Sequence, residues 1–459
     1  MRIYSRLGIV FRQIIYMLAI SIFLVSCSST NGLKAPSENN TSQISTNDIH
    51  NKELTGDLEI QIFVGGYGDE FWNEAIDGFK KEYPNVNVIK QMGPNINLEM
   101  APRWMSGDPP DFAFVDGPEF LDDKVLRKNG MLLDLKEWFN TSKTLDGSAL
   151  IKDNIYKGFM HEYDDGEMYY APYIFGTLGM WYNSKLFKDN NLQVPTNFEE
   201  LLRLAPMLKT KNIALMNYPG LFPTYLYQGF VRENLALLSG QQIFTDIEEL
   251  KPGVFVSEAF YESMYKLEIL SKTDNAFLSG TLEVNHIKSQ EDWLQGKAAF
   301  IPNGMWLENE MKGSIPSDFE MTYIPSLIQD KGQKYVICAY SHDLCIPQKA
   351  KNPEAAKAWL AFLYREKNLS RFTELVGVPT AYKMDLSESN VSEIAKNVQK
   401  WIADPNSLII YDEKSMDERV ENTICNAING VVVGKINARE ACEMVQKEAD
   451  KVWAEKNKK

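Results

Sequence analysis

The sequence predicts an α/β fold built on a parallel sheet, and three neighbouring segments carry that prediction. Residues 58–64 (LEIQIFV) alternate apolar and polar side chains, as a strand with one buried face does. Residues 70–84 show the three-to-four spacing of a helix face, with apolar side chains at Phe71, Trp72, Ala75, Ile76 and Phe79. A second strand (86–92), another helix and a third strand (111–117) follow at similar spacing along the chain. This alternation favours parallel strands joined by crossover helices.

The carboxyl ends of these strands are the expected place for a ligand, because open parallel sheets bind ligands beyond that edge. The three ends are the turns 65–69 (GGYGD), 92–95 (MGPN) and 116–119 (DGPE).

Composition excludes several classes of protein. The chain has 459 residues, of which 44% are hydrophobic and 12% aromatic, so the bulk of it is not disordered. This length suits two or three domains, or one two-lobed body. A net charge of −14 argues against a nucleic-acid partner and against adhesion to an anionic membrane surface. With four His and five Cys, we expect no metal site and no cofactor.

The first 26 residues read as a lipoprotein signal peptide. Three Arg and no acid precede an apolar run of about twelve residues (14–25), too short for a bilayer span of roughly 20. Leu24–Cys27 resembles the lipobox of bacterial lipoproteins, in which the Cys is lipidated; the alternative is an ordinary signal with Cys27 incidental. Residues 27–56 are rich in Ser, Thr and Asn and predict a flexible tether. We therefore expect a protein anchored by lipid at Cys27 on the extracytoplasmic face of the cell membrane.

Helix-start signals mark the rest of the chain. Thr196 with Glu199 predicts a capping box before the helix 198–208. Residues 257–272 have a helical period, and Asp122-Asp123 reads as a helix start. Asn352-Pro353-Glu354 supplies an N-cap and a first-turn Pro for one long amphipathic helix through residue 372.

The four remaining cysteines do not settle their own pairing. Cys338 and Cys345 share one apolar stretch; in a single strand they lie about 23 Å apart, which favours free thiols. Cys425 and Cys442 flank a helical break predicted at Asn429-Gly430 and could meet across an antiparallel pair of helices.

The sequence predicts no catalytic residues. Gly66-Tyr67-Gly68 begins a nucleotide-binding pattern, but Phe71 replaces its third Gly. His161-Glu162 lacks the second His of a zinc protease. Asp122-Asp123 and Asp164-Asp165 could serve as glycosidase carboxylates, yet they are more typical of a helix start and a turn.

Aromatic residues beside turn residues are the strongest chemical signal. Sugars bind by stacking their C–H faces on aromatic rings while polar groups hydrogen-bond the hydroxyls. Trp181 and Tyr182 continue a strand and are expected in the core, whereas Trp306, on a Pro/Gly turn, is expected to contact ligand. His342 is expected to be an ordinary strand residue.

Several stretches between Leu58 and Tyr382 resemble the family 1 extracellular solute-binding proteins, the carbohydrate receptors of bacterial ABC importers. The resemblance lies in their order and spacing: 79–88 (FKKEYPNVNV), 106–117 (SGDPPDFAFVDG), 130–138, 166–202, 293–306 (WLQGKAAFIPNGMW), 346–363 and 377–382 (GVPTAY). The last 75 residues match only as a helical tail.

The resemblance implies a two-lobed, periplasmic-binding-protein-like α/β fold of type II with a ligand cleft between the lobes. Three interlobe crossovers would lie near 174–177, 302–304 and 377–379. Residues 57–173 and 303–376 would form the N-terminal lobe, and residues 174–302 and 377–459 the C-terminal lobe.

The resemblance also implies the site and the partners. The family's cleft aromatics map onto Trp306 and Tyr173, and its polar contacts onto Gly66, Tyr67 and Asp116; the other candidates are Trp72, Phe175, Asn303 and Tyr340. Asn303-Gly304-Met305-Trp306 stands where many relatives have Asp-Gly-Pro-Trp. The implied function is that of a monomeric receptor that delivers a sugar to an ABC permease with a cytoplasmic ATPase. The alternatives are an exported glycoside hydrolase or lyase and a receptor for a non-sugar solute such as a peptide.

Overall fold

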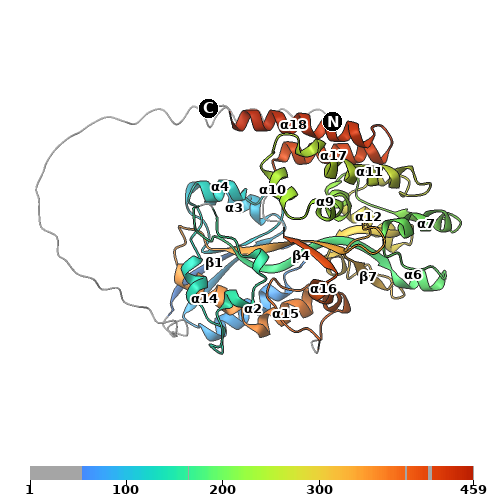
Figure 1. The fold of residues 1–459 in the computed structure, drawn as a ribbon. Helices are drawn as coiled ribbons and strands as arrows, with labels where there is room; N and C mark the ends of the chain where they lie inside the picture. Colours follow the sequence, from blue (N-terminus) through green and yellow to red (C-terminus); the bar gives the residue numbers. More distant parts are fainter. Residues whose placement is uncertain (1–53, 164, 388–389, 412–415, 458–459) are drawn as a thin grey trace, which may run out of the picture. The chain divides into compact units, whose positions relative to one another are not determined.

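One mixed sheet runs through the computed structural model, which describes residues 54–457 except 164, 388–389 and 412–415. Within these residues nine strands pair in the order β2-β1-β3-β8-β4-β6-β5, with β7 added on β4 and β9 on β8 (Figure 1). The strands are β1 (Gly56–Phe63), β2 (Val86–Gly93), β3 (Phe112–Val115), β4 (Ala171–Asn183), β5 (Ala214–Met216), β6 (Ala298–Gly304), β7 (Met321–Ile324), β8 (Tyr335–Cys345) and β9 (Ser407–Tyr411).

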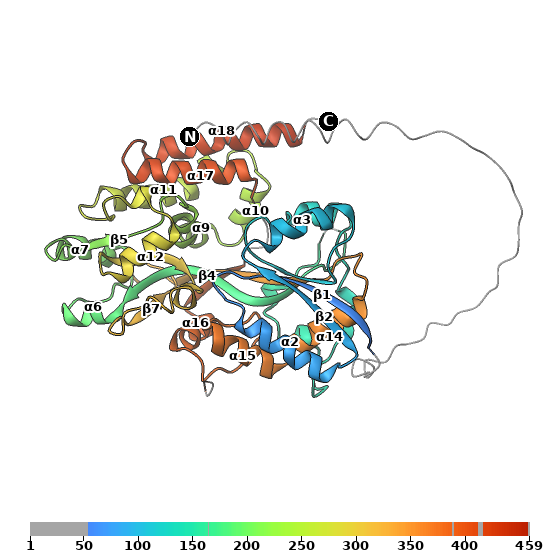
Figure 2. The same ribbon diagram turned by 180° about the vertical axis from the view of Figure 1, so that it is seen from behind.

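The predicted parallel unit is confirmed at one end of this sheet. β1 pairs in parallel with β2 on one side, with Leu58 opposite Val88, and with β3 on the other, with Ile60 opposite Phe112. Leu58, Ile60 and Ile62 are fully buried, as their alternation predicts. Figures 1 and 2 show α2 (Glu70–Glu82) on one face of these strands and α3 (Ile96–Ser106) on the other.

The remaining helices pack around the sheet, and short single turns connect them. The α-helices are α4 (Asp123–Lys128), α5 (Lys136–Thr141), α6 (Ser184–Asp189), α7 (Phe198–Lys209), α8 (Thr224–Leu226), α9 (Arg232–Ser239), α10 (Gln242–Glu248), α11 (Glu258–Lys272), α12 (His286–Leu294), α13 (Leu307–Glu310), α14 (Pro353–Leu363), α15 (Glu366–Val376), α16 (Glu393–Ala403), α17 (Glu418–Val432) and α18 (Ala438–Lys456). The other turns are η3 (Ile151–Asn154), η4 (Lys157–Phe159), the π-helical η5 (Tyr227–Val231), η6 (Val254–Val256) and η7 (Thr281–Glu283).

β4 links the two halves of the sheet. Its first half pairs with β8, where Ala171 lies opposite Leu344, and its second half pairs with β6, where Leu178 lies opposite Gly304. All of its residues up to Tyr182 are buried, so both faces of the strand are covered. The prediction that Trp181 and Tyr182 are core residues is confirmed.

The long helix predicted after Asn352 is wrong in its length. Asn352 caps α14 as expected, its side chain accepting a hydrogen bond from Ala355 N. The chain then breaks at Arg365, whose backbone is extended, and α15 begins at Glu366. The break lets the Arg365 guanidinium make a two-pronged ion pair with Glu82 of α2, at 2.5 and 2.6 Å. α14 and α15 therefore pack on α2 as two short helices.

Two further helix-end predictions need correction. The residue that caps α7 is Asn197, not Thr196: Asn197 Oδ1 accepts a hydrogen bond from Glu200 N, and the Glu200 carboxylate accepts one from Thr196 N. Asn429-Gly430 does not break its helix, because α17 continues to Val432. Asp122 does cap α4, as predicted.

None of the four described cysteines forms a disulfide. Cys338 and Cys345 lie in the single strand β8, as expected. Cys425 and Cys442 lie on α17 and α18, which pack on each other, but they form no bond.

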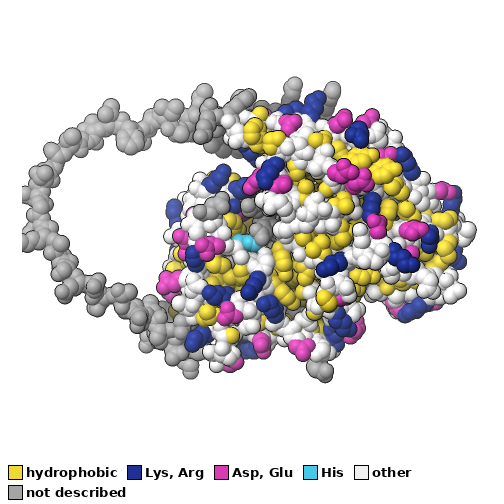
Figure 3. All heavy atoms as spheres, viewed as in Figure 1, with side chains coloured by type: hydrophobic (Ala, Val, Ile, Leu, Met, Phe, Trp, Pro, Cys, Tyr) yellow, Lys and Arg dark blue, Asp and Glu magenta, His cyan; other side chains and the backbone are white. Residues whose placement is uncertain are grey.

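The predicted signal peptide, lipidation at Cys27 and nearly all of the predicted tether lie outside the described residues; β1 begins at Gly56, the last residue of the tether. Of the helices in the described part of the chain, none combines the length and the apolar character needed to span a bilayer. Acidic and basic side chains are interspersed over the face drawn in Figure 3, with hydrophobic side chains between them.

Candidate functional site

A cleft of about 1360 Å³ lies at the carboxyl end of β3. One wall is the turn 116–120, which follows that strand. The opposite wall consists of the segment 220–225, which runs into α8, and one face of α17. Leu178, Gln228, Leu282 and Trp306 complete the lining.

Trp306 is the largest half-buried aromatic of this lining, and two glycines let its ring lie where it does. A β-carbon at Gly304 would lie 2.1 Å from Cζ3 of the indole, and one at Gly66 would lie 3.0 Å from Cδ1. Any side chain at Gly304 would therefore displace the ring. Tyr67 and Tyr225 meet the indole edge-on, with ring centroids 6.3 and 6.4 Å away. Trp306 thus sits at the start of α13 as a supported aromatic surface.

The turn after β1 is tied to the same place. Asn309 of α13 donates a hydrogen bond from Nδ2 to the Gly66 carbonyl at 2.6 Å. Gly66 is half-buried, and Tyr67 is only 7% exposed. These two predicted site residues therefore support Trp306 from behind and do not themselves line the cleft.

Asp116 lines the cleft and connects to Tyr67 through His342. The Tyr67 hydroxyl lies 2.9 Å from His342 Nε2, and His342 Nδ1 lies 3.1 Å from Asp116 Oδ1. The Tyr340 ring stands edge-on to the same imidazole, with centroids 5.2 Å apart, and it is not among the lining residues. The structure brings these four side chains together, although three of them come from segments far apart in the sequence.

Burial and neighbouring charges shift the pKa values of His342 and of the adjacent Asp343 upward. Burial alone lowers the pKa of His342, but the Asp116 carboxylate, and Asp343 to a smaller extent, raise it above its ordinary value overall. Burial raises the pKa of Asp343 to about 7. Across the cleft, burial raises the pKa of Tyr225 to about 12, with a smaller contribution from the Glu310 carboxylate and an opposing hydrogen bond with Trp306.

The other four predicted site residues lie in the interior and not in the cleft. Trp72 packs against the rings of Phe114 and Tyr173, and Tyr173 and Phe175 are fully buried. Asn303 is fully buried in β6. The physical reason is that both faces of β4 and the inner face of α2 are covered, so their aromatics fill the core. We therefore assign no direct ligand contact to these four.

The residues of the opposite wall were not predicted from the sequence. The residues that α17 gives to the cleft recur every three or four positions, which places them on one face of the helix: Glu418, Glu421, Asn422, Cys425, Asn426 and Asn429. The signal was present, because an amide-rich stripe runs beside the apolar face formed by Val420, Ile424 and Ile428. In the segment 220–225 the only sequence signals were the turn-forming residues Gly220 and Pro223. The segment leads into the π-helical turn η5, a feature frequent at functional sites.

The cleft has an acidic character. Among the described residues that line it are the carboxylates of Asp116, Glu119, Glu418 and Glu421, and neither Lys nor Arg. Glu119 has a φ of 61°, a backbone conformation that costs energy for a residue with a side chain and that recurs at binding sites. Such a lining suits a neutral or basic ligand and disfavours an anion.

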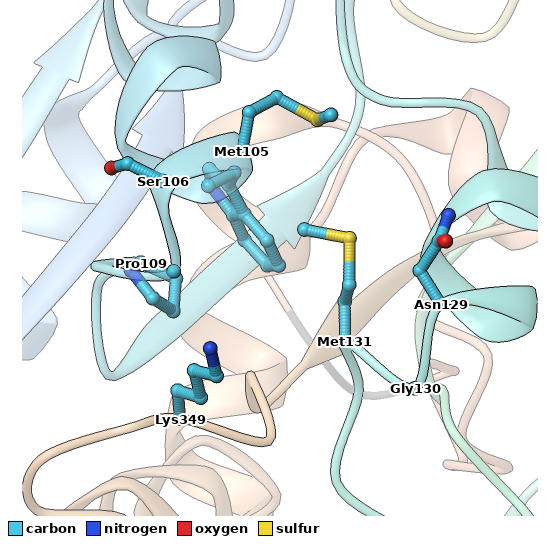
Figure 4. A pocket seen from close by; sticks show the side chains of 9 residues that line it. Met105, Ser106, Pro109, Asn129, Gly130, Met131 and Lys349 are labelled. Atoms are coloured by element: carbon cyan, nitrogen blue, oxygen red, sulfur yellow. The ribbon is translucent and has the colours of Figure 1, made fainter. Parts of the chain in front are cut away.

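A second, smaller hollow lies between α3 and the segment 129–131 (Figure 4). Met105 and Ser106 border it on one side, Met131 on another, and Lys349 reaches in from a different part of the chain. Its volume is 280 Å³. That is below the roughly 300–1,000 Å³ usual for ligand sites, whereas the cleft beside Trp306 exceeds this range.

Comparisons with known proteins agree with this architecture. A diacetylchitobiose binding protein of Streptomyces coelicolor, NgcE, is 25% identical over 95% of this chain and 93% of its own length. A maltooligosaccharide ABC transporter solute-binding lipoprotein of Streptococcus pneumoniae is 23% identical over 93% and 94%. The solved structure of RafE from Streptococcus pneumoniae superposes with a TM-score of 0.69 at 17% identity, covering 87% of this chain and 99% of RafE.

The structural likeness confirms the predicted two-lobed, type II periplasmic-binding-protein fold. Residues 65–369 match the family described as bacterial extracellular solute-binding proteins, whose members are binding proteins. Since that match covers more than half of the chain, the protein belongs to the bacterial extracellular solute-binding proteins.

Proposed function

We propose that this protein is the substrate-binding receptor of an ABC importer and that it binds a sugar or oligosaccharide in the cleft beside Trp306. The observation that carries the proposal is that the supported indole, the Asp116 carboxylate and the amide side chains of α17 line one cleft. An aromatic face with hydrogen-bonding groups at its edge is what a sugar ring requires. The receptor would deliver this ligand to membrane permease subunits driven by a cytoplasmic ATPase.

The proposed ligand is a neutral oligosaccharide of two or more units. A cleft of about 1360 Å³ has room for more than one ring, and its carboxylates argue against uronic acids. The relatives are named for diacetylchitobiose and maltooligosaccharides, which supports this class without selecting one sugar.

We propose that binding closes two lobes about the three crossovers, with residues 57–173 and 303–376 in one lobe and 174–302 and 377–459 in the other. Two of the crossovers lie side by side, because Phe175 N donates a hydrogen bond to the Pro379 carbonyl at 3.1 Å. The third, Pro302–Gly304, pairs with Leu178–Met180 of β4. Ligand contacts made from both lobes at once would favour the closed form. Solution scattering should then show a smaller radius of gyration with saturating sugar, and an unchanged profile despite binding would reject closure.

We further propose that lipidation at Cys27 anchors the receptor, as a monomer, to the extracytoplasmic face of the membrane. The lipobox-like Leu24–Cys27 and a relative named as a lipoprotein support this. Cys27→Ser should move the protein from washed membranes to the soluble fraction and leave sugar binding intact. A variant that remained firmly on the membrane would exclude the lipid anchor.

A thermal-shift panel tests the function itself. Ligand that binds only the folded state raises the melting temperature, so diacetylchitobiose, maltotriose and raffinose are compared with a dipeptide and with buffer. A rise with at least one sugar and none with the dipeptide is the expected result. A rise with the dipeptide alone would point to a peptide receptor, and release of reducing ends during incubation would point to a glycoside hydrolase.

A further inference from the structure

Three side chains linked by polar contacts lead from the buried turn after β1 to the cleft. It begins at Tyr67 in the turn after β1, passes through His342 of β8 and ends at Asp116 in the turn after β3. The His342 side chain is 13% exposed and Asp116 19%, so the contacts between them are largely shielded from water.

The chemistry of the groups fixes where the protons lie. A carboxylate can only accept, so His342 Nδ1 carries the hydrogen that is donated to Asp116 Oδ1. In the neutral imidazole Nε2 is then an acceptor, and the Tyr67 hydroxyl donates to it. Each link therefore orients the next one toward the cleft.

The two oxygens of Asp116 are used differently. Oδ1 accepts from His342 Nδ1 and also from Gly117 N, at 2.7 Å. Oδ2 has no hydrogen-bond partner within the described part of the chain, and Asp116 lines the cleft. The carboxylate is thus held by one oxygen, and the other remains available to a ligand.

We infer that His342 is a positioning residue of the cleft: it fixes Asp116 so that Oδ2 accepts a hydrogen bond from a sugar hydroxyl while the same sugar ring stacks on Trp306. This inference rests on the proposed function. Tyr67 serves both halves of this subsite, because its hydroxyl holds His342 and its ring supports the indole. The aromatic surface and the acceptor at its edge are therefore held in one fixed relation, as a precise site requires.

A double-mutant cycle tests the role, with whichever of diacetylchitobiose, maltotriose and raffinose binds wild type most tightly as the probe. Asp116→Ala should weaken binding about tenfold or more, the loss expected for a hydrogen bond to a charged group. His342→Ala should weaken it by most of that factor. The double variant should bind no more weakly than Asp116→Ala alone, because His342 acts only through Asp116. Additive losses would overturn the inference.

His342→Asn is the matched variant. The side-chain amide of Asn can occupy the place of Nδ1 and donate to Asp116, but it cannot reach Tyr67. It should restore most of the affinity lost in His342→Ala. A merely structural role would not discriminate between these two variants at equal melting temperature, and equal affinities would therefore reject the positioning role.

Nitrogen NMR gives a readout that needs no ligand. The chain has four His, so the His342 ring can be assigned as the signal missing in His342→Asn. At a pH above its pKa, the neutral His342 ring should carry its hydrogen on Nδ1 and none on Nε2. A neutral ring that carries its hydrogen on Nε2 cannot donate to Asp116 and would overturn the inference even if sugars bind.

Wild type that binds none of the three sugars would instead reject the proposed function, and the ligand role of Asp116 with it.

Discussion

The molecule has two groups of aromatic side chains that look alike in sequence but differ in environment. The interior group is Trp72, Tyr173 and Phe175, which are at most 1% exposed and contact other aromatic rings. The cleft pair is Trp306 and Tyr225, which are half-buried and lie edge-on to each other. Both groups stand near Gly or Pro.

The difference between the groups arises from what covers them. Tyr173 and Phe175 lie on β4, where every residue up to Tyr182 is buried and rings from α2 and α15 pack on Tyr173. Trp306 begins a single helical turn after β6, where two glycines and the edges of two Tyr rings lie against it, and it stays half-buried at the margin of the core. Aromatic rings in the interior stabilise the fold, whereas a half-buried ring at a strand end retains a face that a ligand can cover.

The sharpest way to test this contrast is Trp72→Ala. Removal of a fully enclosed Trp should cost about 3–5 kcal/mol of unfolding free energy, measured in urea, while the folded protein keeps its sugar affinity. Trp453→Ala is the control, since Trp453 is 41% exposed on α18 and should change stability by less than about 0.5 kcal/mol. If Trp72→Ala lost sugar affinity and kept its stability, Trp72 would belong with the cleft pair.

Trp306→Ala should give the opposite pattern. Loss of a stacked aromatic anchor commonly costs about 2 kcal/mol, so sugar affinity should fall by roughly 30-fold. The unfolding free energy should fall by less than in Trp72→Ala. Trp306→Phe should recover part of the affinity, because it keeps an aromatic face. Unchanged calorimetric affinity in Trp306→Ala would remove Trp306 from the site.

Asn426→Ala asks whether the polar face of α17 belongs to the same site. A neutral hydrogen bond contributes about 1 kcal/mol, so affinity should fall by about fivefold. Asn406→Ala, at an exposed residue outside the cleft, should leave affinity unchanged. Equal affinities for the two variants would confine the site to the Trp306 side.

The smallest expected effect concerns charge. A probe oligosaccharide with one uronic acid should bind about two- to threefold more weakly than its neutral counterpart at low salt, because the lining carboxylates repel it. The difference should disappear in 1 M NaCl, where charges are screened within about 3 Å. Tighter binding of the acid than of the neutral sugar would contradict an acidic cleft.

The comparison also shows how far sequence reasoning reaches. The parallel unit β2-β1-β3, the apolar face of α2 and the caps at Asp122 and Asn352 were predictable, because each depends on residues close together in the chain. The break at Arg365 was not, since the ion pair that accompanies it is made with Glu82, 283 residues away. The cap at Asn197 was missed because the neighbouring Thr196 is also a suitable N-cap residue. The length of α17 was missed because Asn-Gly usually marks a turn, whereas here the helix continues through it.

The sequence by itself therefore determined the first strands and helices, the sheet direction at one end and the family. Only the tertiary structure decided which aromatics face the cleft, and it placed α17 opposite Trp306 and His342 between Tyr67 and Asp116. The physical reason is that periodicity reports that one side of a segment is covered, but it does not report by what. In this protein the covering residues come from distant parts of the chain: Tyr67 and His342, which are in contact, are 275 residues apart.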